Sequence, residues 1–340
     1  MPRGPLIKAT SLLLALFLGL CFAELTARGL GRGPWVNAQL DRNEPTMHEP
    51  DPVLGWRVLP GQYRVPPYQP DAEPIEMTFL ERGRRRTGGT PVRDPHGDIV
   101  LVGDSFTQGW AINDPDTYAW KLQTSFPKMQ VLNYGTAGYG TYQSLLLLER
   151  ELRRSLKPRL VVYGFNDFHE ERNVATDSWL RTLVSFSRRG HASVPYARYD
   201  PQRGLVRHAP DTYVSLPLRE SSALITLVES GYMRMKTLGR AGHQRVVTEQ
   251  VILQMSEVAR VYRATLIVAL LSASDEAKGH YIRFLQRNGI PAVDCAFELT
   301  DDMKVPGEGH PNGAMNTRWA ACIAAGIATR VDPVAEQESQ

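Results

Sequence analysis

The chain has 340 residues, of which 42% are hydrophobic and 22% are charged, a composition typical of a folded globular protein rather than a disordered one. Lysine and arginine total 39 and aspartate and glutamate 36, so the net charge of +3 provides no strong field for a polyanion, and we expect no nucleic-acid partner. Cys21, Cys295 and Cys322 lack the close spacings of zinc ligands, so the sequence predicts no cysteine-based metal site.

The N-terminus has the make-up of an export signal. Arg3 and Lys8 precede an uncharged run over 9–23, which ends before Glu24. As a helix, this run spans roughly 22 Å, which is less than the ~30 Å hydrocarbon core of a bilayer unless residues before it join. We expect 1–30 to be an uncleaved membrane anchor, with a cleaved signal peptide as the alternative. Either way, the rest of the chain is expected to face the periplasm or the cell exterior.

The segment 31–97 is rich in proline, glycine, aspartate and arginine and shows little periodicity. This pattern predicts an irregular lead-in, with a short hairpin or two, that wraps a core rather than building one. Arginines gather within 82–86, where the sequence indicates an exposed basic loop.

From 98 onward, apolar runs alternate with amphipathic ones, which is the signature of β-α-β units. We expect an α/β fold over 98–330, a three-layer α/β/α sandwich around a mainly parallel sheet of about five strands, with the site at the carboxyl ends of the strands. The expected strands are 99–102, 131–133, 160–163, 265–271 and 292–294, and the main helices are 141–156, 244–264 and 312–330.

Two further segments and the cysteines complete the domain organisation. The segment 168–240 is too long for a simple crossover and is interpreted as an insertion over the site, whereas 331–340 is expected to be a flexible tail. Cys295 and Cys322 have apolar neighbours, among which a buried free thiol is commoner than a disulfide. We therefore expect free thiols and keep a disulfide, in an oxidising compartment, as the alternative.

The strongest chemical signal is the run IVLVGDSFTQG over 99–109, in which a buried strand leads directly into Gly103, Asp104 and Ser105. A serine hydroxyl is a weak nucleophile at neutral pH, so it needs a base within reach and N–H groups that hold an oxyanion. A tight turn from a strand into a helix supplies such N–H groups. Taken alone, Ser105 could equally be a helix N-cap.

Together with three later segments, Gly103-Asp104-Ser105 resembles the blocks of the SGNH (GDSL-type) hydrolase family. The run NYGTAGYGTYQ over 133–143 is similar to the second block, YGFND over 163–167 to the third, and GEGHPN over 307–312 to the last. The matched blocks lie within roughly 98–330. The stretch DPVLGW over 51–56 also resembles the lead-in of exported bacterial members.

The resemblance assigns roles to individual residues. It makes Ser105 the nucleophile and His310 its base, and it makes the N–H groups of Ser105 and Gly138 and the side chain of Asn166 the oxyanion hole. It implies an enzyme that needs no metal and no organic cofactor.

One departure concerns the acid of the catalytic triad. Many family members place an aspartate three residues before the histidine, and that position is Gly307 here. Glu308 is the expected substitute, because its extra methylene can compensate for a shifted backbone. Asp301 or Asp302, or a Ser–His pair oriented by a backbone carbonyl, are the alternatives, and Asp294 is expected to be structural.

Further polar residues near the expected pocket are candidate substrate contacts. His169 and Arg172 have helical spacing directly after the third block and would suit a polar or anionic substrate; a solvated turn with a surface ion pair is the alternative. The full set of candidates is Asp104, Thr107, Asp167, His169 and Arg172.

The export signal and the resemblance together predict a serine esterase that removes O-acyl groups, in particular O-acetyl groups, from a glycan or lipid of the cell envelope. An O-acyltransferase that uses the same residues is the second candidate. A non-catalytic envelope-binding module on the same fold is the third, because Gly307 breaks the motif.

Overall fold

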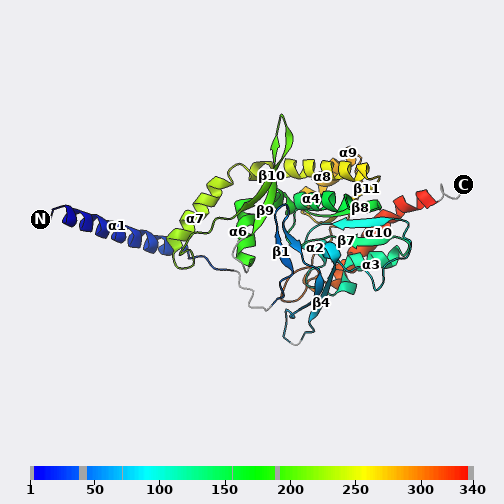
Figure 1. The fold of residues 1–340 in the computed structure, drawn as a ribbon, viewed down its shortest axis with the longest axis horizontal. Helices are drawn as coiled ribbons and strands as arrows, with labels where there is room; N and C mark the ends of the chain where they lie inside the picture. Colours follow the sequence, from blue (N-terminus) through cyan, green and yellow to red (C-terminus); the bar gives the residue numbers. More distant parts are fainter. Residues whose placement is uncertain (1–3, 38–43, 71, 155, 188–191, 336–340) are drawn as a thin grey trace. The chain divides into compact units, whose positions relative to one another are not determined.

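The computed structural model describes residues 4–37, 44–70, 72–154, 156–187 and 192–335, which are drawn in Figure 1. The described residues belong to two compact units. The larger unit comprises 41–176, 193–211 and 240–340, and the smaller comprises 1–40, 177–192 and 212–239.

Within the described residues, the larger unit contains an eight-stranded sheet of order β12-β11-β8-β6-β7-β5-β4-β3. The strands that pair in parallel are β12 (Ala292–Asp294), β11 (Thr265–Ser272), β8 (Pro158–Asn166), β6 (Asp98–Val102) and β7 (Gln130–Asn133). They coincide with the strands expected from the sequence, so the mainly parallel sheet is confirmed.

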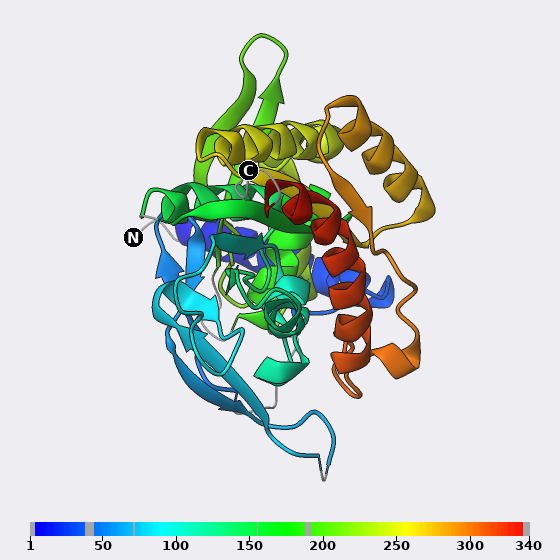
Figure 2. The same cartoon turned by 90° about the vertical axis from the view of Figure 1, so that its right-hand side faces the viewer.

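Helices cover both faces of this sheet, because alternate residues of each strand point to opposite sides. Ile99 and Leu101 pack in one apolar cluster with side chains of α3 (Tyr118–Ser125) and α10 (Gly313–Ala335). Val100 and Val102 pack in the other cluster, which is formed with α4 (Thr141–Leu152), α8 (Gln244–Val261) and α9 (Asp275–Arg287). Figure 2 shows α8 and α10 on opposite sides of the sheet, so the three-layer α/β/α arrangement is confirmed.

The lead-in contributes strands to this sheet. β3 (Gly61–Val65), β4 (Ile75–Leu80) and β5 (Arg84–Arg85) extend it in antiparallel order, and β1 (His48–Asp51) and β2 (Gly55–Val58) form a separate hairpin. Alternate side chains of β4, such as Met77 and Phe79, lie in a buried cluster with Ile112. The expectation that this segment only wraps the core is therefore wrong; its strands were too short and too interrupted by proline and glycine to show a clear period.

Arg85 also departs from the expected exposed basic loop, since it is only 1% exposed. Its Nε donates to Asp114 Oδ1 at 2.6 Å, and its Nη atoms donate to the carbonyls of Gly109 and Ile112. The cause is the pairing of β5 with β7, in which Arg85 lies opposite Asn133 and its side chain is carried into the interior. The guanidinium thus binds the backbone just after the segment that carries Ser105.

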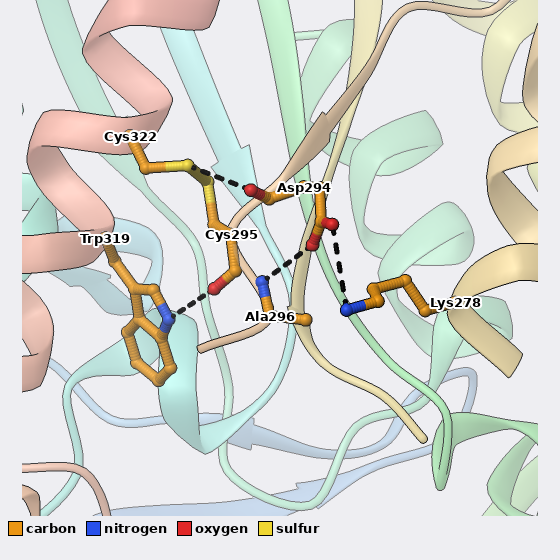
Figure 3. Close-up of a disulfide and its surroundings, with 6 residues drawn as sticks. All are labelled: Lys278, Asp294, Cys295, Ala296, Trp319 and Cys322. Carbon is orange, nitrogen blue, oxygen red and sulfur yellow. Dashed lines mark hydrogen bonds and ion pairs between the residues drawn. A yellow bond between two sulfur atoms is a disulfide. The ribbon is translucent and has the colours of Figure 1, made fainter. Parts of the chain in front are cut away.

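Cys295 and Cys322 form a disulfide, with their Cα atoms 5.9 Å apart (Figure 3). The expectation of free thiols is wrong. Apolar neighbours suit a buried thiol and a buried disulfide equally, and the sequence does not reveal that the end of β12 lies against α10. Trp319 of α10 adds to this contact, because its indole N–H donates to the carbonyl of Cys295 at 3.1 Å.

Removal of this disulfide by the double substitution Cys295→Ser and Cys322→Ser is expected to lower the free energy of unfolding. The bridge closes a loop with a sequence separation of 27, and loop-closure entropy for that length corresponds to about 3.5 kcal/mol. Urea unfolding monitored by tryptophan fluorescence measures the difference. Cys21→Ser is the matched control, since Cys21 is an exposed free thiol; an equal midpoint for both variants would contradict the prediction.

The remaining elements lie along 169–243 and in short turns. In the larger unit, α5 (His169–Asn173) follows β8, and the hairpin of β9 (Ser193–Asp200) and β10 (Gly204–Thr212) packs on the layer of α4 and α8. The smaller unit contains α1 (Gly4–Gly29), α6 (Asp177–Phe186) and α7 (Ala223–Lys236). The short elements are α2 (Ser105–Gln108) and the 3-10 turns η1 (Glu81–Gly83), η2 (Asp114–Asp116), η3 (Ala241–His243) and η4 (Asp301–Met303).

Among the described residues, one helical segment, Lys8–Gly29, is long and apolar enough to cross a membrane. It has 22 residues, and none of its most apolar stretch is buried within the protein. By length and composition, it suits either a membrane anchor or a signal peptide.

Candidate active site

Ser105 is the first residue of α2, directly after the end of β6. The preceding Asp104 caps this helix, since its Oδ1 accepts the N–H of Phe106 at 3.0 Å. The turn is tight: a Cβ on Gly103 would lie 2.2 Å from Thr107 Oγ1. Ser105 itself is 7% exposed. Glycine at 103 is therefore needed to let the strand enter the helix with the Ser105 hydroxyl at its start.

Three residues form a continuous relay at this turn. His310 Nε2 lies 2.9 Å from Ser105 Oγ, although the two residues are 205 positions apart. His310 Nδ1 lies 2.7 Å from Glu308 Oε1. The other carboxylate oxygen, Oε2, accepts the backbone N–H of His310 at 2.7 Å. The structure thus brings together the residues proposed as nucleophile, base and acid.

The geometry at Gly307 explains why the carboxylate beside His310 comes from position 308 rather than from 307. Its φ is 78°, in the left-handed region, and a Cβ at this position would lie 2.5 Å from the carbonyl oxygen of Tyr68 in the lead-in. An aspartate at 307 would need the lead-in to move. The alternatives Asp301 and Asp302 face other groups: Asp301 pairs with Lys304 at 2.9 Å, and Asp302 accepts the hydroxyl of Thr300.

The carboxylate of Glu308 is held in its ionised form. Burial alone would raise its pKa, but hydrogen bonds from the ring and backbone of His310 and from the indole of Trp110, at 3.1 Å, outweigh burial and lower the pKa below 4.5. An ionised carboxylate at Nδ1 fixes the tautomer whose Nε2 can accept the Ser105 proton, and it stabilises the imidazolium that results.

The stability contributed by Glu308 is expected to depend on pH. A carboxylate whose folded pKa is depressed stabilises the protein above its unfolded pKa, and this contribution is lost as the pH falls through the folded pKa. The difference in free energy of unfolding between the native chain and Glu308→Gln should therefore be larger at pH 7 than at pH 3.5. Urea unfolding at both pH values measures it; a difference that grows on acidification would contradict the assignment.

Asn166 lies at the end of β8 beside the nucleophile turn. Its Nδ2 donates to Asp104 Oδ1 at 3.1 Å, and the side chain is fully buried behind the turn. Gly138 lies in the loop between β7 and α4. This loop is attached to the same turn, because the N–H of Thr136 donates to the carbonyl of Gly103 at 3.0 Å. The structure gathers both expected oxyanion residues around the turn that starts at Gly103.

Arg172 connects these parts. Its Nη1 lies 3.2 Å from Asp104 Oδ2 and donates to the carbonyl of Tyr139, the neighbour of Gly138, at 2.9 Å. His169 Nε2 lies 3.2 Å from the same Asp104 oxygen. Burial would raise the pKa of Asp104, but His169 and Arg172 lower it on balance. Burial in turn lowers the pKa of His169, against the opposing effect of Asp104.

Most of the candidate substrate contacts instead make contacts within the protein. Asp104, Thr107 and His169 are fully buried, and Asp104 and His169 lie 3.2 Å from each other. The carboxylate of Asp167 accepts the N–H of Ser274 at 2.8 Å and thereby positions the start of α9. Arg172 retains a side-chain exposure of 12%. The sequence correctly located these residues near the site but did not show which way they point.

Substitution of Arg172 by methionine is expected to lower kcat by a factor on the order of 10 to 100 while changing KM less. Without the guanidinium, the loop of Gly138 loses its side-chain link to Asp104 and keeps the hydrogen bond between Thr136 and Gly103. Small displacements of catalytic groups have effects of this size. Steady-state kinetics on a p-nitrophenyl ester measures both constants. Arg245→Met, which removes a half-exposed ion pair on α8, is the control. Equal effects of the two variants on kcat would contradict a positioning role for Arg172.

Two aromatic features escaped the sequence analysis. Trp110 donates to Glu308 from 198 positions away, and no local pattern links the two residues. Phe106 lies edge-on to His310, with ring centroids 5.8 Å apart, and edge-on to Phe168 at 5.9 Å, forming an apolar wall beside Ser105. The only signal for this wall in the sequence is that an aromatic residue follows Ser105 by one position and another follows Asn166 by two. Among the described residues, no group of three or more His, Cys, Asp or Glu side chains is placed to hold a metal ion.

Comparison with known proteins gives structural matches only. No model of a protein family matches the chain, and no curated protein does. Among solved structures, a member of the lipolytic protein G-D-S-L family from Veillonella parvula is 14% identical; the match covers 69% of this chain and 99% of that one, with a TM-score of 0.40. A GDSL-like lipase from Bacteroides thetaiotaomicron is 15% identical, with coverage of 70% and 93% and a TM-score of 0.38.

Proposed function

We propose that the chain is a serine hydrolase that acts on ester bonds. The observation that carries this proposal is the relay of Ser105, His310 and Glu308, with separations of 2.9 and 2.7 Å. Such a relay suits nucleophilic attack by a hydroxyl that would otherwise be unreactive at neutral pH. The third candidate, a non-catalytic module, rested on Gly307, and the hydrogen bonds of Glu308 remove that reason for it.

In the proposed reaction, His310 Nε2 accepts the Ser105 proton while Ser105 Oγ forms a bond to the ester carbonyl carbon. The N–H groups of Ser105 and Gly138 and the amide of Asn166 hold the oxyanion, each donor contributing about 3 kcal/mol. The imidazolium then gives its proton to the departing alcohol as the C–O bond breaks. Water then attacks the acyl carbon while His310 Nε2 accepts its proton. The bond between that carbon and Ser105 Oγ breaks, the acid leaves, and the imidazolium returns the proton to Oγ.

The proposed substrate is an O-acylated, in particular O-acetylated, glycan or lipid of the cell envelope. Two features support an extracytoplasmic setting: the apolar helix Lys8–Gly29 and the disulfide between Cys295 and Cys322. Transfer of the acyl group to a sugar hydroxyl instead of water would use the same residues and is the second candidate.

Reaction with a fluorophosphonate tests the proposed mechanism. We expect one adduct, on Ser105, because this reagent requires an activated serine hydroxyl. Peptide mass spectrometry after labelling locates it, and heat-unfolded protein is the control. Absence of an adduct on Ser105 in the folded protein would overturn the proposal. Turnover of an acetylated oligosaccharide with and without an acceptor glycan then separates hydrolysis from transfer by the ratio of free acetate to acetylated acceptor.

A further inference from the structure

Helix α7 (Ala223–Lys236) of the smaller unit exposes large apolar side chains while it buries a carboxylate. Its inner face buries the polar side chains of Thr226 and Glu229, which are 7% and 0% exposed, together with Ala223 and Met233. Its outer face carries large apolar side chains at helical spacing. These residues, called here the α7 stripe, are Leu227, Val228, Tyr232 and Met235, followed after the helix by Leu238, and they are between 39% and 76% exposed.

Internal hydrogen bonds fix this orientation. The Oε2 atom of Glu229 accepts the N–H of Leu216 at 2.6 Å, and its Oε1 lies 3.4 Å from Arg219 Nη1. Arg219 in turn donates to the hydroxyl of Ser215 at 2.8 Å. Rotation of the helix to bury the stripe would remove these partners from a buried carboxylate, which is costly. The stripe therefore faces outward, where a contiguous apolar surface of this kind marks a site of interaction.

The position of α7 in the smaller unit indicates what covers the stripe. The carboxylate of Glu24, in the last part of α1, accepts the N–H groups of Ala223 at 3.0 Å and Leu224 at 2.9 Å and the hydroxyl of Ser222 at 2.7 Å. Glu24 lies within Lys8–Gly29, the segment that is able to cross a membrane. Figure 1 shows α7 starting beside this end of α1. If α1 spans a bilayer, the first turn of α7 lies at the edge of the hydrocarbon.

We propose that the α7 stripe lies in the interface of the bilayer that α1 enters, as a second membrane contact. An amphipathic helix with apolar side chains toward the acyl chains and basic side chains at the border is the usual form of such a contact. Exposed Arg234 borders the stripe and can reach lipid phosphates. This membrane contact is independent of the proposed esterase activity.

Site-specific fluorescence in vesicles tests the contact. The full chain in a Cys21→Ala background receives a single cysteine, by Val228→Cys or Met235→Cys, and is labelled with the environment-sensitive dye NBD. The protein is reconstituted into phosphatidylcholine and phosphatidylglycerol vesicles with or without doxyl-labelled lipid. Val261→Cys on α8 is the matched control, because Val261 is an exposed apolar residue of the larger unit whose exposed fraction, 67%, lies between those of Val228, 55%, and Met235, 71%.

We expect NBD at 228 and 235 to emit at shorter wavelength and to be quenched severalfold more by doxyl lipid than NBD at 261. Equal quenching at all three positions, with free access of iodide, would overturn the proposal. Protection of 228 and 235 from both quenchers would also overturn it, because a protein surface would then cover the stripe. Thermal unfolding of each labelled variant, compared with Cys21→Ala, verifies the fold, and the two stripe positions provide independent readings.

Discussion

Ser105→Ala is expected to lower kcat for p-nitrophenyl acetate by about 10³-fold or more, with little change in stability. Loss of Oγ removes the only atom that forms the proposed covalent bond, whereas the turn keeps its glycine and its cap. Initial rates at saturating substrate measure the loss. His310→Ala should produce a similar loss, and the double variant should be scarcely worse than either single one, because residues of one relay act as a unit.

The control is Ser125→Ala on α3, a serine whose hydroxyl only donates to the carbonyl of Lys121. Its turnover should equal that of the native chain. A Ser105→Ala enzyme that retains native turnover would exclude Ser105 as nucleophile. Multiplicative losses in the double variant would show instead that Ser105 and His310 act separately.

Glu308→Gln is expected to lower kcat by about 10³- to 10⁴-fold. The amide keeps the shape of the side chain but cannot stabilise the imidazolium as a carboxylate does, and it can hold His310 in the wrong tautomer. Asp302→Asn is the matched control, since Asp302 is the alternative acid and faces Thr300. A large loss in Asp302→Asn with a small one in Glu308→Gln would reverse the assignment.

An aspartate placed at 307, the usual position in the family, provides a second test of the role of Glu308. The variant Gly307→Asp with Glu308→Gln should turn over no faster than Glu308→Gln alone, because a side chain at 307 meets the carbonyl of Tyr68. Recovery of activity would show that the loop can rearrange and that the contact with Tyr68 does not determine the place of the acid.

The sequence predicted those parts of the fold and site that depend on short contiguous segments. The parallel strands are β-branched and leucine-rich runs buried on both faces, and such runs are visible without tertiary information. Ser105 and His310 were proposed as site residues because each lies in a short motif that resembles a block of the SGNH hydrolase family, and because the blocks occur together. Glu308 followed from the reach of a glutamate, once Gly307 had removed the usual position.

Features that depend on distant contacts were not predictable. β5 has two residues, and nothing in its sequence shows that it pairs with β7 and carries Arg85 inward. The disulfide requires the end of β12 and the middle of α10 to be adjacent. Burial decides the roles of Asp104 and His169, and a polar residue beside a motif looks the same in sequence whether it faces solvent or the interior.

The contacts of the lead-in have a consequence for how the catalytic part can be isolated. Arg85 binds the carbonyls of Gly109 and Ile112 behind the nucleophile, and the indole of Trp56 donates to the carbonyl of Ala137 beside Gly138 at 3.0 Å. A fragment that begins at 98 would retain Ser105, Glu308 and His310 but would lose these hydrogen bonds to the two loops beside Ser105. A fragment that keeps both contacts therefore has to include β2 and β5 as well as 98–330.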